Sequence, residues 1–510
     1  MRVNLVNKKV AVGCFFSLKK LRRFKMKANF WLTRKWLLVF PILFLGAMEA
    51  RAEVKFSDTL SVTGFLRHQL AVHTGENNPT NARIGQVDRN KINLSRTTFL
   101  TEWTYVPNDT FKLYSKVTLM SDQTEALDSK LMKYNAFPLG TPRYGSYLKA
   151  TNDNEWNAEM PELYADMSLG NLWLRVGKQQ IVWGEMISAR ILDAVNPLNL
   201  SWHLQFEPEE FEFIRVPQWA IRARYDVPQM LPLRWLKDVY VEGYLNPGDV
   251  SPTVYPAPGA PYAVRGAPNP AYKITEHDRR GDAEYGFRMG GSVGRISGTL
   301  NYFSRYTQGG YWEGTAPFRV DNVYPRTDLY GAGFTYSSPE PLNLSVSYEG
   351  ILSPDEPYYD KTAPTSTPRI IYKQRLQHAI RVARQTFVFP SPISSMSMSV
   401  QYSEVLVSDN GKVKGSPSPL GESNTIDHTQ NSVSLALRQP FRHNTIMTSL
   451  TAVYDLDDAH YFRPGFAYYH GDHWIFDIYA GILGGREARP GRFASMYWAD
   501  EVFGRITYQF

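Results

Sequence analysis

Cysteine is almost absent from this chain of 510 residues: the only one is Cys14. It lies in an amino-terminal segment that we expect to be removed, so disulfides, cysteine-bound metals and a cysteine nucleophile are excluded for the expected mature chain. Long hydrophobic runs are missing too, since no stretch after Ala52 approaches the roughly 20 residues of a membrane-spanning helix. No phosphate-binding Gly-x-x-x-x-Gly-Lys loop and no dinucleotide fingerprint is found.

The first 52 residues differ from the rest of the sequence. They hold 12 of the 56 Lys and Arg but one of the 49 Asp and Glu, and the apolar run 36–48 ends at the small-x-small sequence 50–52. This pattern predicts a secretory signal peptide over residues 1–52, with Met26 as an alternative start and an uncleaved amphipathic anchor as the alternative reading. Without these residues the chain has 44 basic and 48 acidic residues, a balance of −4, so its charge does not indicate nucleic-acid binding.

Aromatic residues make up 14% of the chain, and the apolar residues after position 52 tend to alternate with polar ones. In 60–70, for example, the even positions are mostly apolar and the odd ones mostly polar. Successive side chains of a strand point to opposite faces, so one face of each segment can meet lipid and the other water. Such segments lie near 60–70, 91–106, 110–121, 160–169, 172–182, 217–227, 237–246, 283–293, 295–306, 328–337, 341–351, 375–388, 394–406, 430–438, 444–455, 461–470, 473–484 and 499–510.

The connections between these segments alternate in length. Short, turn-forming links lie near 107–109, 170–171, 294, 337–341, 390–393, 439–444 and 471–472. Long polar connections lie at 73–90, 122–159, 183–216, 247–282, 307–327, 352–374, 407–429 and 485–498, with one short link at 456–460 where a long one is due. Short periplasmic turns and long extracellular loops are typical of an outer-membrane barrel. The sequence therefore predicts an all-β fold for residues 53–510: a transmembrane antiparallel β-barrel of about 16–18 strands with an inward-folded loop.

The segment that ends at Phe510 alternates well and finishes on an aromatic residue. This resembles the strand that the barrel-assembly machinery of the outer membrane recognises, so that machinery is an expected partner. Outer-membrane lipid is the second expected partner, and a homo-oligomer is left open. The expected location is the outer membrane of a Gram-negative bacterium.

One connection, 183–216, stands out because it carries dense charge. Residues 186–195 place Ile187, Ile191 and Val195 at i, i+4, i+8 spacing, which predicts a short helix that ends at Asn196-Pro197. Before it lies Arg175-x-Gly177-Lys178-Gln179-x-x-x-Trp183-Gly184-Glu185, and after it a strand that begins at Pro217.

These residues resemble the domain of unknown function 1302 family of proteobacterial outer-membrane proteins, mainly over 160–230, although Lys178 stands where the family usually has Arg. The resemblance implies a porin-like barrel and uptake of hydrophobic or aromatic compounds, and it implies no catalytic residues.

Alternation along the flanking strands turns Arg175, Arg222 and Arg224 toward the lumen, and it places Arg67, Arg288, Arg305, Arg381 and Arg505 on polar faces. Acidic residues of the connection stand against them, namely Glu185, Asp193, Glu207, Glu209, Glu210 and Glu212. We interpret this as either a transverse field at a pore constriction or a set of ion pairs that pins the loop inside the barrel. The predicted constriction residues are Arg175, Lys178, Glu185, Arg190, Glu209, Glu210, Glu212, Arg222 and Arg224.

The pattern favours a channel for diffusion or uptake of small solutes, with no cofactor, no metal and no catalytic residue. His470 and His473 form the tightest histidine pair, but they lie in an expected hairpin turn. Three alternatives stay open: a barrel that sheathes an electron-transfer or secretion partner, a plugged transporter for hydrophobic molecules, and an outer-membrane enzyme.

Overall fold

The computed structural model describes residues 53–79, 89–124, 148–152, 156–200, 212–229, 235–248, 252–254, 273–276, 283–364, 366–387, 395–408, 413–414, 429–456, 459–485 and 496–510. The chain divides into two units, Met1–Val54 and Lys55–Phe510, and the barrel belongs to the second. The expected signal peptide lies outside the described residues and stays a prediction. In the described part, no helix combines the length and the apolar composition needed to cross a membrane.

Eighteen strands of the described residues form one closed antiparallel barrel, as the alternation predicts. They are β2 (Leu60–His73), β3 (Ile92–Asn108), β4 (Phe111–Asp122), β6 (Trp156–Leu169), β7 (Leu172–Gln179), β8 (Gln218–Asp226), β9 (Leu236–Asn246), β11 (Glu284–Val293), β12 (Ile296–Tyr306), β15 (Arg326–Ser337), β16 (Leu344–Asp360), β17 (Ile370–Thr386), β18 (Met396–Val407), β20 (Thr429–Phe441), β21 (Ile446–Asp455), β22 (Ala459–His470), β23 (Trp474–Gly484) and β24 (Glu501–Gln509).

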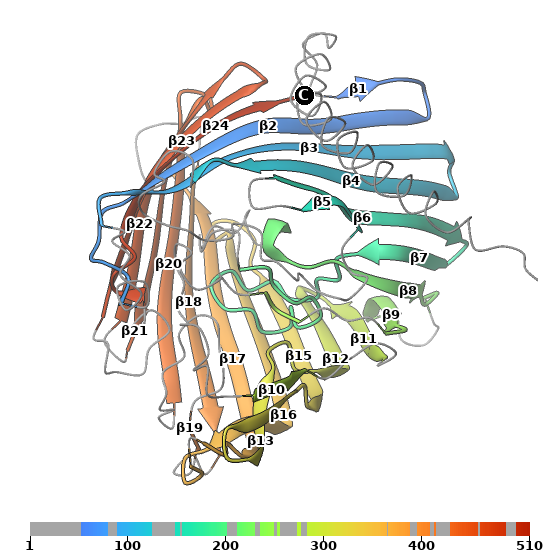
Figure 1. Ribbon diagram of the computed structural model, residues 1–510. Helices are drawn as coiled ribbons and strands as arrows, with labels where there is room; N and C mark the ends of the chain where they lie inside the picture. The colour runs from blue at the N-terminus through green and yellow to red at the C-terminus, as the bar shows by residue number, and fades with distance from the viewer. Residues whose placement is uncertain are drawn as a thin grey trace, which may run out of the picture. The chain divides into compact units, whose positions relative to one another are not determined.

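Each strand pairs with its neighbour along the chain, and β2 pairs with β24 to close the barrel (Figure 1). At this seam the N–H of Gly64 donates to the carbonyl of Phe510 at 2.8 Å, and the N–H of Phe510 donates back at 2.9 Å. The predicted short turns, such as 170–171 and 294–295, lie at one end of the barrel, here called the short-turn end, whereas the short link between β21 and β22 lies at the opposite end, as the sequence indicates. The opposite end carries the long connections, so the predicted sorting of connection lengths is confirmed.

The strands bury one face and expose the other. On β22 the exposed residues are His460, Phe462, Pro464, Phe466, Tyr468 and His470, and the residues between them are buried or half-buried. Exposed large apolar side chains occur in the same way on nearly every barrel strand, for example Ile221 on β8, Leu300 on β12 and Ile478 on β23. The apolar face therefore points outward around the barrel, which is the arrangement that suits a hydrocarbon surround.

Aromatic rings gather on this outer surface near each of the two ends of the barrel. Toward the long-connection end, Tyr302 lies between Tyr285 and Tyr330, with ring centroids 6.3 and 5.4 Å apart. At the short-turn end, Trp474 packs against Tyr508 with the ring centroids 5.0 Å apart. Rings at these two levels are typical of membrane barrels, in which they meet the two interfaces.

The connection expected at 352–374 is mostly strand, and the expectation was wrong there. β16 and β17 stay paired up to Tyr359↔Ile370, which leaves only 361–369 between them. Pro354 suggests a loop in the sequence, but an irregularity between Ser353 and Glu356 takes it out of the ladder and the pairing resumes beyond.

Six smaller strands of the described residues are not members of this ring. β1 (Val54–Lys55), β5 (Leu148–Asn152) and β19 (Val413–Lys414) pair with barrel strands, and β10 (Lys273–Glu276), β13 (Tyr311–Ala316) and β14 (Arg319–Val323) form a three-stranded sheet.

Candidate functional site: a connection folded into the lumen

The connection between β7 and β8, residues 180–217, folds into the barrel and is called the lumen loop below; Figure 1 shows its described parts as green traces inside the ring of strands. Its first half packs against inward-facing side chains of six strands, β8, β9, β12, β15, β16 and β17. This cluster consists of Ile181, Trp183, Ala189, Ile191, Leu192, Ala194 and Val195 of the loop with Ala220, Tyr244, Phe303, Leu329, Ile351 and Ala379 of the wall.

The later part of the lumen loop reaches a different part of the wall. Leu198, Leu200 and Ile214 form one buried cluster with side chains of β21, β22 and β23, among them Val453 and Tyr461. The backbone of the loop is also bonded across itself, since Asn199 N donates to Ile214 O at 2.6 Å. Because the two clusters lie on separate groups of strands, the lumen loop crosses the interior from one side of the barrel to the other.

The helix expected over 186–195 is absent. These residues are extended or bent, because their backbone N–H groups donate to the wall and not to carbonyls one turn earlier. Glu185 N donates to Glu349 Oε1, and Leu192 N donates to Glu349 Oε2 at 3.1 Å. Ile187 N donates to Gln401 Oε1 at 3.2 Å. The wall carboxylate and amide therefore replace the internal hydrogen bonds of a helix.

The sequence Trp183-Gly184-Glu185 has a structural explanation in these contacts. Trp183 Nε1 donates to Glu242 Oε1 of β9 at 2.9 Å, and its ring packs edge-on against Tyr244. Gly184 passes close to a later part of the loop, where an added Cβ would lie 2.6 Å from the backbone nitrogen of Asp193. The tryptophan thus fixes the loop to the wall, and the glycine lets the loop close on itself.

Leu192 occupies a notch in β15. It is 1% exposed, and a Cβ on Gly333 would lie 3.1 Å from Leu192 Cδ1, while a Cβ on Gly331 would collide with Leu192 Cδ2. Two glycines at alternate positions of one strand leave the inner surface without side chains at this point. The leucine fills that space, so the notch sets where the lumen loop lies along the barrel axis.

Asn196 ties the two ends of the lumen loop together. It is fully buried; its Oδ1 accepts from Ile181 N at 2.8 Å, and its Nδ2 donates to Val216 O at 2.9 Å. The Asn-Pro pair that suggested a helix stop therefore acts as a cross-link between the strand-proximal ends of the loop.

A three-residue charge cluster stabilises the same turn. Arg190 Nε lies 2.9 Å and Arg215 Nη2 lies 2.8 Å from Asp193 Oδ2. Burial alone would raise the pKa of the Asp193 carboxyl, but the two guanidinium groups outweigh it and hold that pKa below its ordinary value. The carboxylate is therefore charged at neutral pH and links residue 190 to residue 215.

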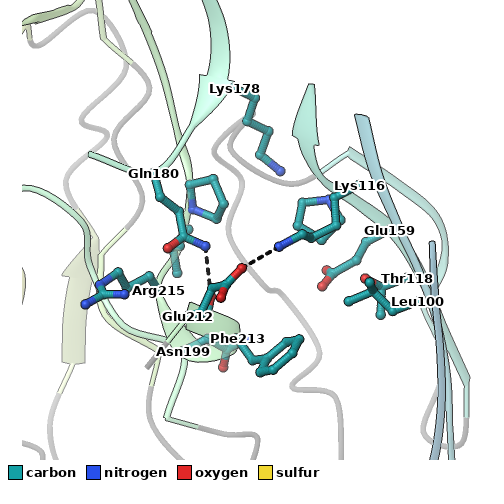
Figure 2. A pocket seen from close by; sticks show the side chains of 13 residues that line it. Leu100, Lys116, Thr118, Glu159, Lys178, Gln180, Asn199, Glu212, Phe213 and Arg215 are labelled. Atoms are coloured by element: carbon teal, nitrogen blue, oxygen red, sulfur yellow. Dashed lines mark hydrogen bonds and ion pairs between the residues drawn. The ribbon is translucent and has the colours of Figure 1, made fainter. Parts of the chain in front are cut away.

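Figure 2 shows the contact of the loop with the β4 side of the barrel. Lys116 of β4 is buried, and its Nζ lies 2.8 Å from Glu212 Oε1 of the loop. The same Nζ lies 3.1 Å from Glu102 Oε1 and 3.5 Å from Glu162 Oε1, both on the wall. The pocket between them has a volume of about 30 Å³, room for one water, so the loop is closely fitted on this side.

Lys178 lines this pocket beside Lys116 (Figure 2), and its Nζ donates to Met160 O at 3.1 Å. Strict alternation would turn Lys178 away from Arg175 and toward lipid. The φ of Gly177, +136°, breaks the alternation at this point, and a Cβ there would lie 2.7 Å from the Cα of Tyr164. The glycine of the motif thus serves a close approach between β6 and β7 and turns the lysine inward.

The predicted arginines of the wall bind acids of the wall. Arg175 Nε lies 2.6 Å from Asp166 Oδ1, and Arg224 Nε lies 2.8 Å from Asp226 Oδ1. Arg222 Nε lies 2.6 Å from Glu242 Oε1. In the described part of the chain, these three arginines therefore bind carboxylates of the wall: Asp166 and Glu242 lie on neighbouring strands, and Asp226 lies on the same strand as Arg224. Their place at a constriction stays a prediction. Glu207, Glu209 and Glu210 lie outside the described residues.

Sequence reasoning missed the acids on which the wall depends. Glu242 is 1% exposed and accepts from Trp183, Arg222 and Arg288, the last at 2.6 Å. The available signal was an acid in the middle of an alternating strand: Glu242 follows the exposed Val241, so alternation turns it inward among cations. The same reasoning would have found Glu349 on β16.

Two cavities lie on opposite faces of the lumen loop. One of about 240 Å³ faces the short-turn end and is lined by Trp183, Glu185 and Leu192 of the loop together with Arg288 and Glu349 of the wall. The other, of about 150 Å³, faces the long-connection end and is lined by Arg190 and Asp193 of the loop and by wall residues of β12 and β15 to β17. The loop therefore separates two spaces that approach it from the two ends of the barrel.

The histidine pair of the sequence has other bonding partners. His473 Nδ1 lies 2.8 Å from Gln509 O, and His470 Nδ1 lies 3.3 Å from Tyr468 Oη. Among the described residues, no group of three or more His, Cys, Asp or Glu side chains is arranged to hold a metal ion.

A closed eighteen-strand antiparallel barrel in the described residues, apolar outside and crossed inside by one connection, is an outer-membrane β-barrel of porin-like fold. Residues 70–367 match the family described as "Protein of unknown function (DUF1302)". This is more than half of the chain, so the chain belongs to that family, as the resemblance at residues 175–197 indicated. No curated protein matches the sequence.

Several solved structures match this chain over most of its length at low sequence identity. OccAB1 of Acinetobacter baumannii has a TM-score of 0.47 and 12% identity, with 90% of this chain and 97% of that chain covered. OmpF of Salmonella typhi, in complex with daunomycin, has a TM-score of 0.41 and 10% identity, with 90% of this chain and 100% of that chain covered. Wzi of Escherichia coli, described as a carbohydrate-binding β-barrel involved in group 1 capsule assembly, has a TM-score of 0.45 and 8% identity, with 87% of this chain and 84% of that chain covered. Likeness at this level concerns the fold and says nothing about a solute or a ligand of this chain.

Proposed function

We propose that this protein is a channel in the outer membrane of a Gram-negative bacterium, through which small solutes cross at a constriction formed by the lumen loop. One observation carries the proposal: the loop crosses the interior and has a cavity on each face, of about 240 and 150 Å³. A barrel of about eighteen strands is wide enough for an aqueous passage unless something fills it, and here one connection narrows it.

The lining favours polar over hydrophobic solutes. Glu242, Glu349 and Lys116 are charged side chains buried on the inner wall. Each of the eighteen described barrel strands is hydrogen-bonded to both of its neighbours, so the wall has no gap between strands. A transporter that releases hydrophobic molecules sideways needs a lateral opening, which these ladders do not favour. The apolar inward residues of the wall are covered by the lumen loop. Uptake of an aromatic solute stays compatible if that solute also carries a polar or charged group.

Conductance across a planar lipid bilayer tests the role of the loop. Residues 186–212 are replaced with a short Gly-Ser linker. This change removes most of the lumen loop, keeps Trp183 and leaves the barrel strands intact. We expect the single-channel current to rise severalfold because the constriction is gone. An unchanged current from folded barrels would mean that the loop does not limit the passage.

Swelling of liposomes that contain the protein tests the solute class. A panel of sugars, amino acids, small carboxylates and aromatic acids is compared at equal size. We expect size-dependent entry with a preference among charged solutes. Swelling that depends on size alone would show that the charged lining has no selective role.

A sheath around an electron carrier or a secretion partner is less favoured, because such a barrel needs an interior free for its partner. The lumen loop is bound to at least six strands by its first half alone. Copurification of a stoichiometric partner would reverse this preference.

A further inference from the structure

The cavity of about 150 Å³ on the long-connection face of the lumen loop has an excess of positive charge. Three guanidinium groups line it, those of Arg190, Arg305 and Arg375, and one carboxylate, that of Asp193. Arg190 and Asp193 form an ion pair at 2.9 Å, and Arg375 Nη1 lies 3.9 Å from Glu356 Oε1, at the limit of an ion pair. Even with that weak contact, the lining leaves at least one cation without a close counter-charge.

Arg305 on β12 is the cation of this cavity for which the described residues provide no direct ion-pair partner. Its Nε is buried and has no hydrogen-bond partner among the described residues. Glu356 and Glu284 act on its charge from a distance, but no ion pair joins Arg305 to either of them in the described part of the chain. A half-buried guanidinium with no paired carboxylate costs free energy, so this position favours an anion that reaches it from the cavity.

A second polar group in the same cavity is also unsatisfied. Ser353 on β16 is 3% exposed, and its Oγ is buried without a hydrogen-bond partner among the described residues. Buried hydroxyl groups in native proteins are nearly always hydrogen-bonded, so an unsatisfied one at a cavity wall indicates a bound group. Asp193 Oδ1 is unsatisfied as well, and a water held beside the anion can donate to it.

The rest of the lining consists of two glutamines and four apolar residues. Gln308 and Gln377 both donate through Nε2 to carbonyls of the lumen loop, those of Ala194 and Arg190. Ile191 and Ala194 of the loop and Leu329 and Ile351 of the wall are all buried there. An inorganic oxyanion has no part that benefits from such a surface, whereas an organic acid has a hydrocarbon tail that does. A volume of about 150 Å³ accommodates a molecule of about the size of benzene.

We propose that this cavity binds small monocarboxylates with an apolar tail, the carboxylate at Arg305 and Ser353 and the tail against Ile191, Leu329 and Ile351. The inference rests on the proposed channel function only in that it makes the cavity a subsite on the solute path. Binding itself does not depend on conduction. The planar guanidinium can donate two parallel hydrogen bonds to a carboxylate, which gives orientation as well as affinity.

Isothermal titration calorimetry of the folded barrel in detergent, in a low-salt zwitterionic buffer, tests the site. Benzoate and butyrate are the probes, inorganic phosphate tests for a general oxyanion site, and benzyl alcohol has the tail without the charge. We expect both carboxylates to bind more tightly than phosphate and benzyl alcohol. The absence of carboxylate binding by folded protein, or tighter binding of phosphate, would overturn the proposal.

Variants separate this site from a general charge effect. Arg305→Gln should weaken benzoate binding at least about tenfold, since a hydrogen bond to a charged group is lost, and Ser353→Ala should weaken it by a smaller factor. Arg295→Gln, an equal charge change in the exposed turn between β11 and β12, should leave it unchanged. Equal binding by wild type and Arg305→Gln would refute the assignment. Each variant is checked for heat-modifiable migration, which reports a folded barrel.

Bilayer conductance of the same wild-type protein distinguishes the two proposals. Conduction without carboxylate binding would leave the channel in place and remove the subsite. Binding without conduction would leave the subsite in place and remove the channel.

Discussion

The fit of Leu192 into the Gly331–Gly333 notch of β15 can be tested by changing the size of both partners. Leu192 is 1% exposed, so Leu192→Ala should cost about 2–5 kcal/mol of the free energy that holds the lumen loop in place. Gly331→Ala introduces a methyl group that collides with Leu192 Cδ2, and overpacking of this kind costs about 1–3 kcal/mol. At about 1.4 kcal/mol per factor of ten, Leu192→Ala should raise the undocked population of the loop about 30-fold or more, and Gly331→Ala about fivefold or more.

The double variant is the decisive one. With alanine at both positions, the new methyl group at residue 331 enters space that Leu192 has left. Its cost should therefore fall short of the sum of the single costs by about 1 kcal/mol or more, as expected for residues in contact. Gly298→Ala on β12 is the matched control, because its Cβ would meet only Gly333 O, at 3.4 Å.

The assay is the frequency of large-current events in single-channel recordings, which reports undocking, alongside thermal unfolding in detergent. Both single variants should show more large-current events than wild type, and the control should not. Strict additivity in the double variant, or single variants that match wild type in both measurements, would refute the idea that the notch positions the loop.

Three further predictions concern other contacts of the loop. Ser188 and Ser434 share a hydrogen bond at 2.7 Å, so cysteines at both positions should form a disulfide on mild oxidation and abolish the large-current events; failure to cross-link in folded barrels would contradict the docked position. Lys116→Met should lower thermal stability by about 3–5 kcal/mol, because buried Glu162 loses its cation, whereas Lys237→Met at an exposed site should not; equal unfolding temperatures would refute this. The lowered pKa of Asp193 contributes stability that is present above its ordinary value of 3.8 and lost as the pH falls through the folded value, so large-current events should increase in acid, and Asp193→Asn should show no such pH dependence.

The strands could be predicted from the sequence because a single rule places them. A barrel residue meets lipid or the interior according to its parity, and β22, with Phe462, Phe466 and Tyr468 exposed, follows that rule throughout. The rule fails where backbone geometry interrupts it, as at Gly177 and between Ser353 and Glu356. Lys178 and the length of β16 were outside the reach of alternation for this reason.

The interior was harder to predict because its partners are far apart in the sequence. The spacing of Ile187, Ile191 and Val195 suits a helix, but Glu349 supplies hydrogen-bond acceptors from a strand more than 150 residues later. Helix propensity depends on nearby residues, so it could not predict that hydrogen bonds to Glu349 would replace those within a helix. The pairing of Arg222 with Glu242 was missed because acids were sought in the loop and not on the neighbouring strand.

The seam between β2 and β24 joins segments more than 400 residues apart in sequence. Such a contact carries a large loop-closure entropy and should form late in folding. Once the barrel is closed, the lumen loop can enter the lumen only through one of the two open ends. We therefore expect the lumen loop to pack against the open sheet before β2 and β24 pair. A folding intermediate inserted in the membrane would then already contain the loop that narrows the lumen.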